Sequence, residues 1–433
     1  MDIKNIFQEL ENLPKGYISK KVIKGHTYFY LQYFENGKLL SKYIPKEKAN
    51  EIAAQIKRRK ELEKAIKLIG PYKPLRKLSN RDKSLSGAIM MGDRVTARFV
   101  DGNISYIDES TCPLYIKRTK DVSTFLANRI LDLSRPNARL LLKTLAIQDK
   151  KEEYIALYSR GLCISDNYWF RASGSKLKYS DICFDNDAYS DLALKGKIVQ
   201  MPAFGRSPEL TAIGSFEKCW KKIAGEWWMY KAGKNEEIFS ELFCFHLAKL
   251  LKIPTAIYEF SDGFIRTKNF ADKHNFEPMF SLADDNEEYE FVFNLLYRLD
   301  QNIAQSYIAL LWFDCLVFNP DRHNQNYGLL RNKKNGNIIS LAPNFDNNLA
   351  LIAYSKTLHQ DPQTDNLIKL FTTFLNNNKQ AMGLFKNMPM HHLNVNMVNS
   401  IYKEIPIKFI ESEIGISSFI MNRYLYLKSI YDS

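Results

Sequence analysis

The chain has 433 residues, of which 45% are hydrophobic and 25% charged, and its net charge at pH 7 is +13. This length exceeds the capacity of one compact core, so we expect two or three folded units. The sequence contains no run of about 18 apolar residues and no signal-peptide pattern, which excludes a helical membrane span and predicts a cytoplasmic protein. The six cysteines show no Cys-x-x-Cys spacing, which argues against a zinc site and a disulfide framework.

We expect residues 1–75 to form a basic module of three strands and one helix. Alternating polar and apolar residues predict strands at 17–24, 27–34 and 38–44, and Pro45 opens a long helix that carries four consecutive basic residues. This pattern resembles the small DNA-binding arms of phage-type integrases, which implies DNA as a partner. A scaffold or an oligomerisation module explains the same pattern equally well.

Residues 80–195 are predicted to form a separate α+β region. Their patterns favour strands at 97–100, 103–107 and 153–158 and a helix at 124–133. The sequence of this region does not indicate a chemistry of its own.

A single-glycine loop precedes a strand that ends in a lysine. The loop, at 211–220, contains Gly214, where the missing side chain would let backbone N–H groups approach a phosphate. Ser215 and Lys218 belong to the same loop. One glycine is a weak signal by itself. The interpretation as a phosphate-binding loop therefore depends on the strand and the helix downstream of it.

Lys231 and Glu241 come next, on a strand and a helix. Lys231 ends the aromatic, strand-like run 226–231, and Glu241 lies on the helix after it, which Pro254 stops. In phosphoryl transfer, a lysine that reaches the phosphates is held by an ion pair with a helix glutamate. Lys231 and Glu241 would form that pair, although each alone could be a surface charge in a chain with 61 Lys and Arg.

The segment 265–272 is the expected hinge between two lobes. Its residues Lys268, Asn269 and Phe270 would offer their backbone groups to an adenine ring. The composition of the segment carries little information of its own.

A buried helix predicted at 303–318 leads into the most informative part of the chain. Pro320 ends this helix, Asp321 and Asn326 come next in a turn, and Asp346 lies 20 positions beyond Asn326. Phosphoryl-transfer sites reuse a carboxylate at the attacking hydroxyl, and an amide oxygen and a second carboxylate on magnesium. A polar turn after a core helix is the simpler alternative.

These turns resemble the motifs of HipA-like serine/threonine kinases. The stretch Asn-x-Asp-Arg-His-x-x-Asn at 319–326 precedes Ala-Pro-x-Phe-Asp at 342–346, as in that family. The resemblance implies that Asp321 is the catalytic base and that Asn326 and Asp346 hold magnesium. The order Asp-Arg-His reverses the His-Arg-Asp of ordinary protein kinases.

The resemblance also implies a fold. We expect an α+β, bilobal, protein-kinase-like structure with its small lobe at 196–272 and a mainly helical large lobe at 273–433. The α+β region at 80–195 and the β-ribbon plus helix module at 1–75 would precede it.

The function that the resemblance implies is ATP- and magnesium-dependent phosphorylation of serine or threonine in a protein substrate. It further implies a toxin paired with an antitoxin protein, or a related effector whose secretion stays open. Autophosphorylation is expected at Ser207, Thr211 or Ser215, where an added phosphate would repel ATP. Two alternatives remain, a lipid kinase of the phosphoinositide type and a DNA-binding regulator whose kinase-like half only binds nucleotide.

Overall fold

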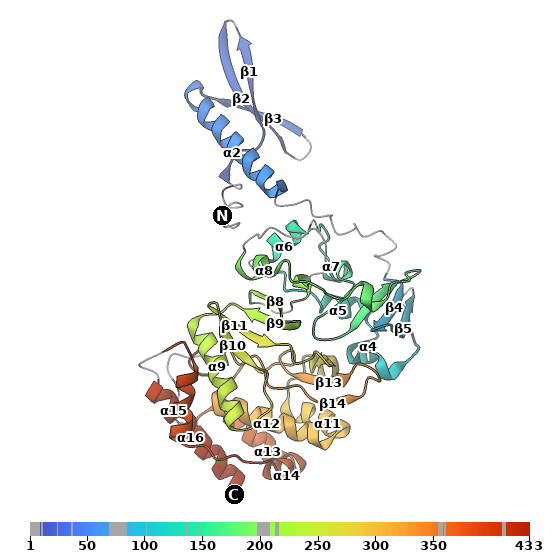
Figure 1. Ribbon diagram of the computed structural model, residues 1–433, viewed down its shortest axis with the longest axis vertical. Helices are drawn as coiled ribbons and strands as arrows, with labels where there is room; N and C mark the ends of the chain where they lie inside the picture. The colour runs from blue at the N-terminus through green and yellow to red at the C-terminus, as the bar shows by residue number, and fades with distance from the viewer. Residues whose placement is uncertain are drawn as a thin grey trace. The chain divides into compact units, whose positions relative to one another are not determined.

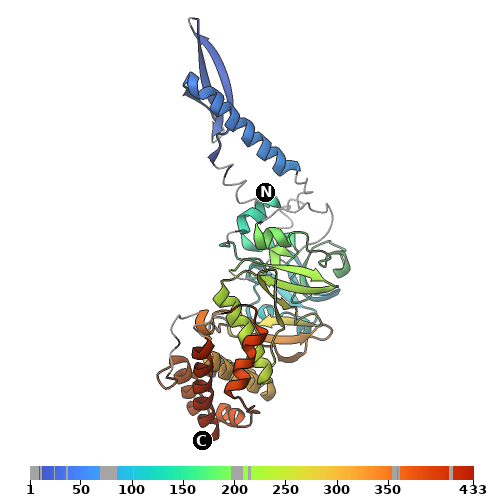
Figure 2. The same ribbon diagram turned by 60° about the vertical axis from the view of Figure 1, so that its left-hand side comes forward.

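The computed structural model divides the chain into two compact units, which we describe separately. The first comprises 1–77, 136–148 and 188–205, and the second comprises 78–135, 149–187 and 206–433. The structure describes residues 9, 12–23, 25–35, 38–68, 85–100, 102–135, 137–145, 147–196, 208–212, 216–353, 358, 361–408 and 413–433. Figures 1 and 2 show the elements of each unit from two directions.

The N-terminal part of the first unit is an antiparallel sheet followed by a long helix (Figure 1). Its strands are β1 (Tyr17–Ile23), β2 (His26–Glu35) and β3 (Lys38–Ile44), in that order, and the helix is α2 (Ala49–Leu68). Gly25, with φ of 79°, supplies the left-handed backbone between β1 and β2. The three strands and the helix predicted from the sequence are thus confirmed. The same unit contains α6 (Ala138–Thr144) and α8 (Ser190–Lys195).

The second unit begins with a four-stranded antiparallel sheet in the order β6-β5-β4-β7. The strands are β4 (Gly87–Met91), β5 (Arg94–Val100), β6 (Asn103–Tyr106) and β7 (Tyr168–Ala172). The helices between β6 and β7 are α4 (Leu114–Thr119), α5 (Val122–Ala127) and α7 (Glu152–Tyr158), together with α6 of the first unit. The strands expected at 97–100 and 103–107 are confirmed by β5 and β6, the second up to Tyr106. The helix expected at 124–133 is confirmed only up to Ala127, where α5 ends, and 128–133 are not helical.

The strand predicted at 153–158 is wrong, because these residues form α7. Ile155, Ala156 and Leu157 are buried in succession, and α7 packs against α5. Glu152 and Glu153 occupy its first turn, where acidic side chains interact favourably with the helix dipole. A short apolar run fits a buried helix as well as a strand, and periodicity alone does not separate them.

A second antiparallel sheet carries the lysine that was expected to bind phosphates. Its strands are β8 (Lys218–Ile223), β9 (Glu226–Lys231), β10 (Tyr258–Ser261) and β11 (Phe264–Lys268), in the order β10-β11-β9-β8. In the sheet, Lys231 pairs with Lys218 on one side and with Ile265 on the other. Two lysines directly opposite each other repel, so this pairing is unfavourable unless anionic groups lie nearby. The helix α9 (Asn235–Leu250) comes after β9 and is largely buried.

The remaining part of the second unit is mainly helical. A three-stranded antiparallel sheet consists of β12 (His274–Pro278), β13 (Gly328–Asn332) and β14 (Ile338–Leu341). The helices are α10 (Phe280–Ala283), α11 (Tyr289–Leu299), α12 (Gln301–Val317), α13 (Asn366–Asn377), α14 (Lys379–Lys386), α15 (Val395–Glu404) and α16 (Glu413–Asp432). The apolar helix α12 is buried along most of its length, as its composition predicts.

The second unit thus has the α+β architecture expected from the sequence. Its strand-rich part holds the sheet β8 to β11, and its helix-rich part holds α11 to α16 (Figures 1 and 2). Within the described residues, no helix combines the length and the apolar character that crossing a membrane requires.

Candidate active site

The turn that carries Asp321 begins where α12 ends. Phe318 adopts a left-handed backbone with φ of 51°, and the next residue, Asn319, is buried. The Asn319 backbone N–H donates to the carbonyl oxygen of Asp314 at 2.9 Å, and its side-chain oxygen accepts the N–H of Asp321 at 3.3 Å. These bonds fix the direction in which the chain leaves the helix and place Asp321, partly exposed, on the wall of a pocket.

Arg322 joins this turn to the one that carries Asp346. Its guanidinium is buried and makes two bonds to the Asp314 carboxylate, at 2.9 and 2.8 Å. It also donates to the carbonyl oxygens of Asn326, at 3.0 Å, and Phe345, at 2.8 Å. The buried ion pair explains an acidic residue inside an otherwise apolar helix, and it holds the two polar turns at a fixed distance.

The turn at Asp346 is held by the sheet and by α9. Asp346 has a left-handed backbone with φ of 61°, a conformation that is strained for a residue with a side chain. Its N–H donates to the Tyr258 hydroxyl at 3.0 Å, and the N–H of Asn347 donates to Glu241 Oε1 at 2.9 Å. Tyr258 also forms a hydrogen bond with Glu241. Glu241 therefore positions the Asp346 turn.

Lys231 pairs with Asp346 in the structure, and the expected ion pair with Glu241 is not formed. The distance from Lys231 Nζ to Asp346 Oδ1 is 2.5 Å, and the centre of the Phe216 ring lies 4.7 Å from the ammonium. The Glu241 carboxylate is already occupied by the Asn347 N–H and acts on Lys231 only through its charge. Glu241 thus serves the backbone turn, and Asp346 is the carboxylate that contacts the lysine.

Asn326 and Asp346 offer oxygen atoms of the kind that magnesium prefers. The Asn326 amide group donates to the carbonyl oxygen of Asp321 at 2.6 Å, and its side-chain oxygen is buried without a hydrogen-bond partner. An unpaired buried oxygen is unfavourable unless a donor or cation binds it, so the residues present fit a magnesium ion. Magnesium usually takes only one or two protein ligands besides phosphate and water. The described residues hold no group of three or more His, Cys, Asp or Glu suited to a metal.

Two lysines face the pocket from adjacent strands. Burial, and then repulsion by Lys231, lowers the pKa of Lys218 to about 7, against the opposing charges of Asp346 and Glu241. Within the described part of the chain, no hydrogen bond or ion pair reaches the Lys218 ammonium. Burial also disfavours the charged form of Lys231, but Asp346 and Glu241 outweigh it and raise the pKa of Lys231. Lys218 is therefore a pocket cation with no counterion in direct contact, as a phosphate-binding group would be.

Asp321 has the environment of a proton acceptor. Burial raises the pKa of its carboxyl group, and the charge of Asp346 raises it further, while His323 and Lys231 oppose the shift. A raised pKa brings a carboxylate closer to the range in which it accepts a proton efficiently near neutral pH.

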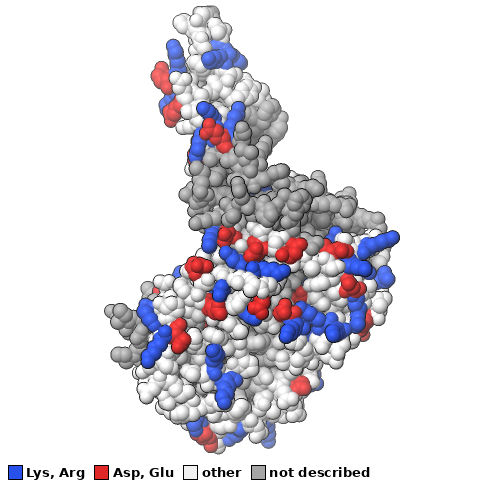
Figure 3. All heavy atoms as spheres, in the orientation of Figure 1, with Lys and Arg blue, Asp and Glu red and all other residues white. Residues whose placement is uncertain are grey.

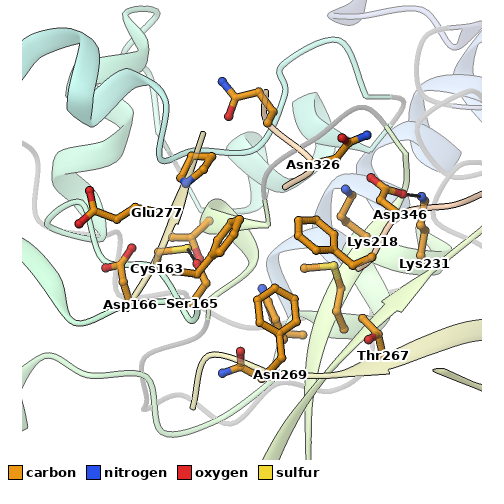
Figure 4. Close-up of a pocket in the computed structure, with 18 of the residues that line it drawn as sticks. Cys163, Ser165, Asp166, Lys218, Lys231, Thr267, Asn269, Glu277, Asn326 and Asp346 are labelled. Carbon is orange, nitrogen blue, oxygen red and sulfur yellow. Dashed lines mark hydrogen bonds and ion pairs between the residues drawn. The ribbon is translucent and has the colours of Figure 1, made fainter. Parts of the chain in front are cut away.

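These groups lie at one end of a single pocket of about 320 Å³, which is within the range of small-molecule sites. Figure 4 shows Lys218, Lys231, Asp346 and Asn326 close together there, with a dashed line between Lys231 and Asp346. Asp321 lines the same pocket. We call this part the phosphate end.

The other end is built by residues that the sequence did not reveal. Figure 4 places Cys163, Ser165, Asp166 and Glu277 there. The Asp166 carboxylate forms two bonds with the buried guanidinium of Arg129, at 2.6 and 2.9 Å. We call this part the far end. The only sequence signal for the far end was Asp166, an acidic residue in an aromatic stretch. Its partner Arg129 lies 37 positions away, so no local pattern joins these two residues.

The expected hinge residues Lys268, Asn269 and Phe270 all line the pocket. The Lys268 ammonium pairs with Glu226 at 2.6 Å, and the Asn269 side-chain amide donates to the carbonyl oxygen of Ile164 at 3.3 Å. The second bond ties the sheet β8 to β11 to the region that precedes it in the sequence. Contact between adenine and the backbone of the hinge stays a prediction.

The hydroxyl groups expected to be phosphorylated lie in a segment that the structure describes only in part. Ser207, Gly214 and Ser215 fall outside the described residues. Thr211 is buried, and its hydroxyl donates to the carbonyl oxygen of Pro208 at 2.7 Å. Thr211 also lines the pocket, with its hydroxyl already bonded to the backbone.

A family model for a domain of unknown function, DUF6788, matches residues 2–54, which include β1 to β3. No curated protein matches the chain.

Solved structures resemble a larger part of the chain. HipA from the toxin–antitoxin system of Shewanella oneidensis MR-1, in complex with HipB and its operator DNA, aligns with a TM-score of 0.54 and 12% identity. The alignment covers 80% of this chain and 100% of that chain. The proinflammatory kinase CtkA of Helicobacter pylori aligns with a TM-score of 0.38 and 17% identity, over 50% of this chain and 93% of that chain. The HipA alignment shows that this chain has a HipA-like kinase fold.

Proposed function

We propose that the chain is an ATP- and magnesium-dependent kinase that phosphorylates serine or threonine residues of a protein. The observation that carries this proposal is the convergence of Asp321, Asn326, Asp346 and Lys231 at the phosphate end, where the Asn326 side-chain oxygen has no partner. The HipA-like fold supports the same reaction class.

Each group at the phosphate end has a role that its surroundings support. Lys231 and Lys218 would bind the phosphates of ATP, and Asp321 would accept the proton of the attacking hydroxyl. Asn326 and Asp346 would hold magnesium, which supplies positive charge to the phosphates when it is bound. Phosphoryl transfer needs mainly positioning and charge stabilisation, so these five side chains suffice for the chemistry.

We further propose that the chain acts as the toxin of a toxin–antitoxin pair. The HipA structure that it resembles contains HipB and operator DNA, so an antitoxin protein is the partner to search for first. The substrate would be a second protein that presents a serine or threonine to Asp321.

Autophosphorylation would regulate the site through the loop that covers the phosphates. Of the three expected hydroxyl groups, Thr211 is buried and bonded, which leaves Ser207 and Ser215 as the favoured acceptors. A phosphate group adds about −1.5 to −2 charges at neutral pH and would repel the phosphates of ATP.

The test is a transfer assay with purified protein, labelled ATP and magnesium, with and without cell extract, followed by mass spectrometry of the products. Asp321→Asn should lower phosphoryl transfer by about 10²–10⁴-fold while ATP binding persists, because an amide cannot accept the proton. Asp346→Asn should instead weaken magnesium-dependent ATP binding, because a charged ligand is lost. Phosphate on Ser207 or Ser215 in the wild type, and on neither in Asp321→Asn, would support autophosphorylation.

Asp262→Asn is the matched control, because Asp262 is exposed in the turn between β10 and β11 and has a left-handed backbone that asparagine tolerates. It should transfer phosphate like the wild type. Equal activity of Asp321→Asn and the wild type would contradict the assignment of Asp321 as the proton acceptor. Transfer to phosphoinositide vesicles in preference to protein would favour the lipid-kinase alternative.

A further inference from the structure

The sheet of the first unit has two unlike faces. One face, which we call the tyrosine face, carries, among the described side chains, Tyr17, Ser19, Lys21, His26, Tyr28, Tyr30, Gln32, Leu39, Ser41 and Tyr43. The opposite face carries the apolar Ile18, Leu31 and Ile44, and Ile44 is buried together with Ala49 and Ile56 at and within α2. The helix therefore covers part of the opposite face, around Ile44, while Val22 and Leu40 on that face are exposed. It leaves the tyrosine face open.

The tyrosine face is exposed and carries no acidic side chain. Tyr17 and Tyr43 are 48% and 54% exposed, and Lys21 and Ser41 are exposed as well. Residues 15–60 contain twelve Lys and Arg but three Glu, and basic side chains are visible on the surface of this unit in Figure 3. A module of this charge attracts a polyanion and repels a second copy of itself. Lys21 lies on the tyrosine face, whereas Lys20 and Lys42 lie on the opposite face.

The geometry of the tyrosine rings indicates which polyanion fits. The Tyr30 and Tyr43 rings meet edge to face, with centroids 5.8 Å apart at 69°, and the Tyr28 ring is tilted by 54° to that of Tyr43 at 6.4 Å. The Lys21 ammonium lies 5.2 Å from the centre of the Tyr30 ring. Single-stranded nucleic acid is bound by stacking its bases on open ring faces. Rings that pack against each other and against a lysine instead present edges and hydroxyl groups, which suit the phosphates and groove edges of a duplex.

The spacing of the strands sets how much of the sheet a groove can take. Three strands spaced about 4.8 Å apart occupy about 14 Å, and the major groove of B-DNA, about 12 Å wide, admits two strands. We propose that the tyrosine face binds duplex DNA, with Lys21 contacting phosphate and with hydroxyl and amide groups of the sheet entering the major groove. This surface is independent of the phosphate end, so DNA binding does not require kinase activity.

The test measures fluorescence anisotropy of a short mixed-sequence duplex with the full chain at several salt concentrations. The double variant Lys21→Glu with Tyr43→Ala should lower affinity by more than about tenfold and flatten the salt dependence, because fewer counterions are released. Lys57→Glu makes the same charge change on the exposed surface of α2 and should lower affinity by no more than about twofold. Ser41→Glu, at an exposed position that leaves folding undisturbed, should weaken binding like the double variant.

Three results would overturn the proposal. Equal losses for Lys57→Glu and for the double variant would show that only net charge matters. Tighter binding of single strands, or equally effective competition by polyglutamate, would exclude a duplex-specific surface. Absence of binding at low salt would exclude a nucleic-acid surface altogether.

Discussion

Two ion pairs contribute a carboxylate to the wall of the same pocket, Glu277 of one and Asp346 of the other, and they differ in how completely the protein satisfies them. At the far end, Arg331 and Glu277 are 2% and 5% exposed, and the Tyr168 hydroxyl both donates to Glu277 at 2.8 Å and accepts from Arg331 at 3.0 Å. At the phosphate end, Lys231 and Asp346 are 13% and 32% exposed and share one bond. The first pair is closed and structural, whereas the second can exchange its partner for a ligand.

The charge of Asp346 makes this exchange possible. Burial disfavours its ionised form, but Lys231 and Lys218 outweigh burial and lower the pKa of Asp346 to about 2. The carboxylate therefore stays ionised at neutral pH and can pass from a lysine to a cation without a change of protonation. Perturbed charges beside an open pocket indicate function, while equally buried charges with complete partners indicate stability.

The comparison predicts that Arg331→Met mainly lowers stability, whereas Lys231→Met mainly removes ATP binding. Arg331→Met leaves the Glu277 carboxylate buried without a cation and should lower the free energy of unfolding by about 3–5 kcal/mol. Lys231→Met removes one partly exposed pair and should change it by no more than about 1 kcal/mol. Only Lys231→Met should abolish ATP binding. Urea unfolding monitored by tryptophan fluorescence gives the stabilities, and calorimetry gives the affinities.

The opposite pattern would contradict the distinction between a structural ion pair and one that exchanges its partner for a ligand. A strongly destabilised Lys231→Met would mean that the pair with Asp346 is structural. A stable Arg331→Met protein that fails to bind ATP would mean that the far end contacts the ligand through charge.

A second prediction concerns how ATP affinity at the phosphate end depends on pH. Because the pKa of Lys218 is about 7, ATP affinity should fall by about tenfold per pH unit well above pH 7, where the lysine loses its charge. Lys231, Asp346, Arg135 and Glu241 surround this lysine. The pKa of Lys231 is raised, that of Asp346 is lowered to about 2 and that of Arg135 is lowered to about 10, so these three keep their charge between pH 6.5 and 8.5. Burial raises the pKa of Glu241, which Lys218→Met retains, so the variant separates the two groups. Lys218→Met should bind ATP weakly at pH 6.5 and lose this dependence.

The same group predicts the pH dependence of stability. The pKa of Lys218 is depressed from 10.5 in the unfolded chain to about 7 in the folded protein. The unfolded chain therefore binds more protons in this window, and the free energy of unfolding should rise with pH between about 7 and 10.5 relative to Lys218→Met. Denaturant titrations of both proteins at pH 7 and pH 9 measure the difference. A difference that stays constant would show that Lys218 is solvated.

The sequence predicted those parts of the site that local motifs encode. Asp321 and Asn326 lie in one short turn, and the turn with Asp346 has its own motif, so their approach to Lys231 required only the expected order of elements. Their catalytic roles remain proposals. The segments around Ser207 and Ser215 lie outside the described residues, so the expectation for them stays a prediction.

The missed features depend on distances that the sequence does not contain. The partner of Lys231 depends on which carboxylate the backbone leaves free, and Glu241 is occupied by a turn 106 positions away. Arg331 bonds to the carbonyl oxygen of Cys112, 219 positions away, so the far end could not be read from any window of sequence. The helix α7 was mistaken for a strand because an apolar run this short shows too little periodicity to separate the two.

The smallest predicted effect concerns Tyr258, which links α9 to the Asp346 turn. Its hydroxyl accepts the Asp346 N–H at 3.0 Å and bonds to Glu241, so Tyr258→Phe should loosen the turn without removing a ligand to ATP. We expect kcat to fall by about three- to tenfold, equivalent to about 0.6–1.4 kcal/mol, with a small change in KM. Tyr230→Phe is the matched control, because Tyr230 is also buried. Its hydroxyl accepts a hydrogen bond from Arg266, at 2.9 Å, and does not contact the Asp346 turn. Equal effects of both variants on kcat would mean that Tyr258 contributes only to the packing of the sheet, whereas a selective loss in Tyr258→Phe would show that the open ion pair relies on a rigid turn behind it.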